Sequence, residues 1–107
     1  MASKQVDVVV KEYVKLLRKN NIRVEKAILF GSHVSGRSHK DSDIDVAIIS
    51  QDLGQDRIEE MVVLKEIAEE VNYDLSPRPY SLEQYINAQR GQFLHDEVIK
   101  KGKVIDA

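Results

Sequence analysis

Apolar residues recur at spacings of three and four near the start of the chain, and this period predicts an amphipathic helix over Ser3–Asn20. The pattern then shortens to a largely apolar run over Val24–Phe30, which is typical of a buried strand. A mostly polar stretch, Gly31–Ser42, separates it from a second predicted strand over Asp43–Ser50. The later half of that strand is apolar on both faces, so we expect it to be central and covered on both sides.

The second half of the chain returns to a helical period. Apolar positions from Ile58 to Val71 predict a long helix with Glu and Lys on its outer face. Asn72–Ser76 is predicted as a third strand, which the Pro77-Arg78-Pro79 segment ends as a surface loop. The alternative for Arg78, which lies just past Asp74, is that it reaches a phosphate. A capping-box pair, Ser81 with Gln84, begins a last helical region.

That region breaks near Gly91 and resumes at Phe93, and Lys103–Asp106 predicts a short edge strand. The order of elements predicts an α/β or α+β fold in which a small mixed sheet is flanked by helices.

Composition limits the size and the partners of this chain. Its 107 residues, 42% of them hydrophobic, suit a single domain over residues 1–107. Sixteen basic residues against eighteen acidic ones give a net charge of -2, which excludes an extended nucleic-acid surface held by counterion release. The absence of cysteine excludes disulfides and thiolate zinc sites. With no apolar run near membrane length and no signal pattern at the N-terminus, we expect a cytoplasmic protein without membrane contact.

Two carboxylates stand at the head of the second strand. Asp43 and Asp45 are two residues apart, so in a strand they project to one face while Ile44 faces the opposite layer. Side by side they repel each other, and a hard divalent cation such as Mg²⁺ relieves that repulsion. The alternative is a solvated strand start without a metal, which the apolar remainder of the strand disfavours.

Asp74 is a candidate third acid, because the neighbours Tyr73 and Leu75 are expected to face the core. If the second and third strands are adjacent, Asp74 joins Asp43 and Asp45 on one surface, where it can bind metal and accept a proton from an attacking hydroxyl. A solvent-facing position before a loop explains Asp74 equally well.

The polar stretch begins with a glycine and a serine at the end of the first strand. Gly31 lets backbone approach a phosphate closely, and a helical turn that starts at Ser32 directs N–H groups and a hydroxyl toward it. His33, Arg37, His39 and Lys40 add local positive charge. An ordinary surface loop is the alternative for the pair alone, but the pair followed after ten residues by Asp43-x-Asp45 is a joint pattern that chance rarely produces.

The segment ILFGSHVSGRSHKDSDIDVAII resembles the G-S-x10-D-x-D signature of the DNA polymerase β-like nucleotidyltransferase superfamily. The short chain is similar to the minimal nucleotidyltransferases of the MNT or MntA type. The resemblance implies that Gly31, Ser32, Arg37 and Ser42 bind the nucleotide. It also implies that Asp43, Asp45 and Asp74 form the catalytic and metal-binding set for two Mg²⁺ ions. Family members often carry an arginine at the positions of Ser35 and His39.

The resemblance implies an activity and a partner as well. The expected reaction is transfer of a nucleotidyl group, AMP from ATP, to a hydroxyl of a partner protein. The expected partner is an HEPN-domain toxin of a toxin–antitoxin pair, bound in a hetero-oligomer. Two alternatives stay open: a non-catalytic antitoxin or binding module that retains the fold, which Ser35 and His39 favour, and nucleotidyl transfer to a small molecule.

Overall fold

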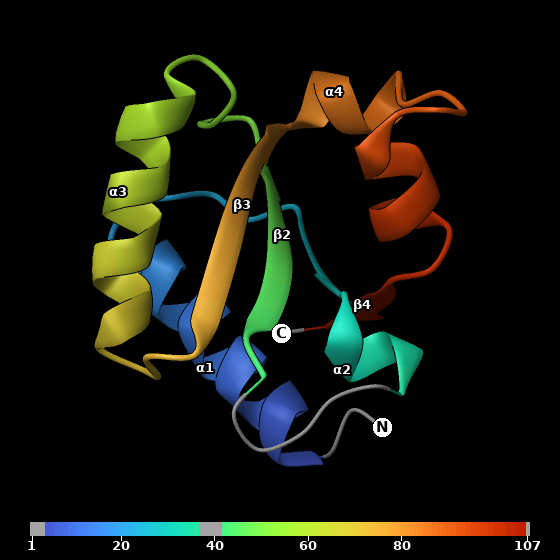
Figure 1. Ribbon diagram of the computed structural model, residues 1–107. Helices are drawn as coiled ribbons and strands as arrows, with labels where there is room; N and C mark the ends of the chain where they lie inside the picture. Colours follow the sequence, from blue (N-terminus) through green and yellow to red (C-terminus); the bar gives the residue numbers. More distant parts are fainter. Residues whose placement is uncertain (1–3, 37–41, 107) are drawn as a thin grey trace.

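The structure, a computed structural model, describes residues 4–36 and 42–106. It is a four-stranded mixed sheet with helices on both faces (Figure 1), so the predicted α/β architecture is confirmed. In chain order the elements are α1 (Lys4–Lys19), β1 (Lys26–Phe30), α2 (Ser32–Ser35), β2 (Ile44–Ser50), α3 (Arg57–Glu69), β3 (Leu75–Ser81), α4 (Leu82–Ile86), the π-helix η1 (Leu94–Ile99) and β4 (Lys103–Ile105). None of the helices in the two described ranges is long and apolar enough to cross a membrane.

The strands lie in the order β3-β2-β1-β4, so β2 is central, as predicted. It pairs antiparallel with β1 and parallel with β3, while β4 pairs antiparallel with the other edge of β1. Alternate residues of β2 enter two separate cores. Val46 and Ile48 face α1 and α3, whereas Ala47 and Ile49 face α4 and η1. The carboxylates at the head of β2 therefore lie at the end of a fully covered strand.

The third strand was predicted wrongly. It spans Leu75–Ser81, so Asn72–Asp74 lies in a turn before it and the Pro77-Arg78-Pro79 segment is part of the strand rather than a loop. Prolines are tolerated here because β3 is an edge strand. Residues two apart direct their backbone nitrogens to the same side, and at the open edge a missing N–H costs no ladder hydrogen bond. Both proline rings are buried on the face that Leu75 shares.

The local signals at the other turns are confirmed. A helical turn does begin at Ser32, and the Ser81–Gln84 capping box is present, with the Gln84 N–H donating to Ser81 Oγ at 3.0 Å. The last helical region is shorter and less regular than expected. α4 has five residues, and η1 is a π-helix in which the Lys100 N–H donates to the His95 carbonyl at 3.0 Å.

Tyr13 joins α1 to α3, and its replacement gives a first prediction. Its hydroxyl is buried and donates to the Leu64 carbonyl at 2.8 Å, while burial raises the pKa of the phenol well above its usual range, so it stays a donor. We expect Tyr13→Phe to lower the free energy of unfolding by about 1 kcal/mol, the usual net value of one such bond. Urea denaturation of the variant and the wild type measures this difference in the free energy of unfolding.

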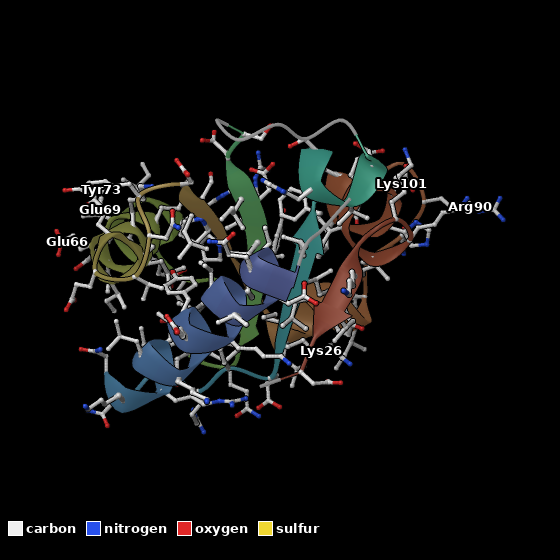
Figure 2. All side chains as sticks on the ribbon, turned by 90° about the horizontal axis from the view of Figure 1, so that it is seen from below. Lys26, Glu66, Glu69, Tyr73, Arg90 and Lys101 are labelled. Atoms are coloured by element: carbon white, nitrogen blue, oxygen red, sulfur yellow. The ribbon has the colours of Figure 1, made fainter. Side chains whose placement is uncertain are left out.

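Tyr73→Phe is the matched control, because Tyr73 is 77% exposed and lies on the outer side of the molecule near Glu66 and Glu69 (Figure 2). Equal stability of the Tyr13→Phe variant and the wild type would show that the α1–α3 contact depends on packing alone.

Candidate active site

The site begins where β1 ends at Phe30. Gly31 has φ 78° and ψ -147°, a conformation that essentially only glycine adopts. A Cβ atom at this position would lie 2.3 Å from Asp45 Oδ2. The backbone of the glycine-serine loop therefore passes directly against the Asp45 carboxylate, and no larger residue fits between them. The two halves of the sequence signature are in contact.

The helical turn α2 follows at once. The Gly31 carbonyl accepts hydrogen bonds from the N–H groups of Val34 and Ser35, at 3.1 and 3.0 Å, and Gly36 ends the turn in the left-handed region. A turn in this position leaves its first N–H groups without partners inside the helix. Ser32, its first residue, is half-buried beside the Gly31–Asp45 contact. This arrangement leaves room for phosphate binding by Gly31 and Ser32, which stays a prediction.

His33 connects α2 to the start of β2. Its side chain is buried, and Nε2 lies 3.3 Å from the Ser42 carbonyl, so it ties the helical turn to the residue before Asp43. The sequence indicated only a local positive charge at His33. Arg37 lies outside the described residues, and the assignment of Ser42 to the nucleotide stays a prediction.

Asp45 is half-buried, and Asp43 is exposed beside it. Burial raises the pKa of the Asp45 carboxyl, the negative charge of Asp43 raises it further, and Arg78 and His33 partly offset the rise. The ionised pair is therefore electrostatically costly. Oxygen donors that repel each other in this way suit a hard divalent cation, which is the fit expected for Mg²⁺.

Asp74 lies at the same end of the sheet, in the turn before β3. Its carbonyl accepts the Ile44 N–H at 2.7 Å and its own N–H donates to Asn72 Oδ1 at 2.7 Å, so its backbone is fixed while its side chain is exposed. Within the described residues, no three His, Cys, Asp or Glu side chains are grouped closely enough to hold a metal. The role of Asp74 as third metal ligand stays a prediction.

Arg78 was predicted to lie in a surface loop, but it is a residue of β3. In the β2–β3 register Asp45 pairs with Ser76 and Ala47 pairs with Arg78, which places Arg78 on the Asp45 face of the sheet. The period-two alternation of polar and buried residues along β3 could have revealed this, had the prolines not been interpreted as a strand end.

Comparisons with known proteins agree with this geometry. The family described as Polymerase beta, Nucleotidyltransferase matches residues 11–106. The protein adenylyltransferase MntA of Shewanella oneidensis is 44% identical over 39 residues, which are 36% of this chain and only 28% of that protein.

Solved structures are also similar. A crystal structure of a toxin–antitoxin with AMP-PNP has a TM-score of 0.63 and 28% identity, over 91% of this chain and 72% of that one. A mutant of the toxin–antitoxin MntA-HpeT has a TM-score of 0.62 and 26% identity, over the same shares. Because the family match covers residues 11–106, which is most of the chain, this chain belongs to the polymerase β nucleotidyltransferase family.

Proposed function

We propose that this chain transfers AMP from ATP to a hydroxyl of a partner protein, as the antitoxin of a toxin–antitoxin pair. The observation that carries the proposal is the contact of Gly31 with Asp45, which brings the glycine-serine turn and the Asp45 carboxylate to one point. The name of the Shewanella relative, and the similar toxin–antitoxin structure solved with AMP-PNP, support the choice of reaction and nucleotide. An HEPN-domain toxin, a hetero-oligomer and a cytoplasmic location are parts of the same proposal.

Each group in the site has a defined task in this reaction. Gly31 and the first turn of α2 hold the phosphates, with Ser32, Ser42 and Arg37 as further donors. Asp43, Asp45 and Asp74 would hold Mg²⁺, which neutralises charge on the phosphates when bound. The acceptor oxygen forms a bond to the α-phosphorus as the bond to the pyrophosphate oxygen breaks, and Asp74 accepts the hydroxyl proton.

The test is a transfer assay with α-labelled ATP, Mg²⁺ and the protein encoded beside this chain. We expect the label on that partner, and we expect Asp43→Ala with Asp45→Ala, or removal of metal by EDTA, to reduce it by at least about 10³-fold, because the phosphates and metal lose their ligands. Glu66→Ala with Glu69→Ala is the matched control, since it removes two carboxylates from the outer side of α3 (Figure 2).

Two outcomes would change the conclusion. Undiminished labelling by the Asp43/Asp45 double variant would remove the carboxylates from the reaction. Neutralisation of the partner by the same variant without ATP would instead favour a non-catalytic binding module.

A further inference from the structure

Arg78 is a neighbour of Asp45 across two parallel strands. Asp45 pairs with Ser76, and Arg78 is the next residue along β3 with its side chain on the same face. The electrostatic effect of Arg78 on Asp45 agrees with this placement. An arginine side chain at such a diagonal position can reach a ligand bound at the carboxylate.

One aromatic ring, which itself packs against a second, lies against the guanidinium. The Arg78 guanidinium lies over the Phe93 ring, 4.6 Å from its centroid, and Phe93 packs edge-on against Phe30 at 5.8 Å. Phe30 is the register partner of Asp45 on β1 and immediately precedes Gly31. The Phe30 and Phe93 rings thus connect the end of β1 to the Arg78 guanidinium, which belongs to the strand on the other side of Asp45. Stacking on Phe93 restricts the guanidinium, which would otherwise be flexible.

The hydrogen-bond donors of Arg78 are available. Over residues 4–36 and 42–106 no carboxylate pairs with the guanidinium, which interacts there with the Phe93 ring and, through its field, with Asp45. A half-buried arginine that forms no ion pair with a carboxylate of the described residues is suited to an anionic ligand.

The guanidinium also lines a pocket of about 600 Å³ between β3, α4 and η1, a volume typical of small-molecule sites. Charged residues of this pocket are Arg57, Arg78 and Glu83, which gives it a net positive charge. Amide side chains of Gln84 and Asn87 supply further polar groups. Arg78 therefore borders an open pocket of net positive charge, although Asp45 itself does not line it.

We propose that Arg78, braced by Phe93, binds the phosphate chain of the nucleoside triphosphate from the side of the site opposite α2. This inference rests on the proposed nucleotidyl transfer and adds a ligand outside the family signature. In this proposal a strand residue adds its positive charge to the donors of the glycine-serine loop.

The test is calorimetric titration of the full chain with AMP-PNP and Mg²⁺, and separately with inorganic tripolyphosphate. We expect Arg78→Met to weaken both ligands about 10- to 100-fold, the range for loss of a charge-assisted contact. Arg78→Lys, which keeps the charge but not the planar fork, should recover part of this loss, and Phe93→Leu should weaken binding several-fold by releasing the guanidinium. Arg90→Met is the control, because Arg90 is exposed and points away from the sheet (Figure 2).

The outcomes separate this inference from the function on which it rests. If the wild type binds AMP-PNP and a folded Arg78→Met variant binds it within twofold as tightly, Arg78 is not a phosphate ligand and the proposed function stands. If Arg78→Met weakens AMP-PNP but leaves tripolyphosphate unaffected, the contact is to the nucleoside and the proposal is overturned. If the wild type binds neither ligand, the proposed nucleotidyl transfer is contradicted, and the role of Arg78 is contradicted with it. Thermal unfolding of each variant identifies any loss that is due to misfolding.

Discussion

Gly31→Ala is expected to reduce AMP transfer about 100-fold or more while the protein remains folded. The added Cβ would lie 2.3 Å from Asp45 Oδ2, so either the carboxylate or the loop must move, and φ of 78° with ψ of -147° is strained for alanine. A displacement of about 1 Å in a catalytic group is sufficient for a loss of this size. The measurement is the rate of label transfer from ATP, with circular dichroism to confirm folding.

Gly36→Ala is the matched control for Gly31→Ala. Gly36 also has a positive φ, 84°, but a Cβ built on it meets nothing within 4 Å. The control therefore adds backbone strain in the same loop without a collision with Asp45, and we expect it to retain most of the activity. Equal losses in the two variants would attribute the effect to backbone strain, and near-normal activity of Gly31→Ala would contradict the close fit of the loop to the carboxylate.

The proximity of Gly31 and Asp45 could be predicted from the sequence. Gly31 and Asp45 belong to a local pattern, strand end and strand start, and β1 and β2 are antiparallel neighbours separated by one loop. Continuous apolar runs identified both strands, because β1 and β2 are buried on both faces, where polar residues are disfavoured. A short connection then brings the end of the first strand to the start of the second, so spacing along the chain was a good guide to proximity.

The positions of Arg78 and His33 in the site could not be predicted from the sequence in this way. Arg78 approaches Asp45 only through the parallel register of β2 and β3, which a crossover through α3 creates and which no local pattern specifies. Two prolines beside Arg78 also obscured the strand, since their compatibility with β structure depends on β3 being an edge. The contact of His33 with the Ser42 carbonyl likewise depends on how a long loop folds back.

Asp45→Asn is expected to stabilise the metal-free protein at neutral pH. We expect the same substitution to reduce the rate of AMP transfer by at least about 10³-fold. Burial and the charge of Asp43 raise the pKa of Asp45 above its value in the unfolded chain, so the native state holds this proton more tightly. The stabilisation that comes from this tighter binding of the proton is fully present at pH values below the pKa of Asp45 in the unfolded chain. It is lost as the pH rises through the pKa of Asp45 in the folded protein. At pH 7 the ionised group is therefore a net cost, which asparagine removes.

Thermal unfolding at pH 7 and pH 4, with and without Mg²⁺, measures this trade-off. Without metal at pH 7 we expect Asp45→Asn to unfold about 2–5 °C above the wild type, the shift that somewhat less than 1 kcal/mol gives in a domain of this size. The gain should shrink toward pH 4, where more of the wild-type carboxyl is protonated, and Mg²⁺ should stabilise the wild type more than the variant. Asp43→Asn, at an exposed position, should give a smaller gain through the removed repulsion alone. A variant that unfolds below the wild type at pH 7 would mean that Asp45 supports the fold; the predicted gain would mean that its charge is kept for the metal and the reaction.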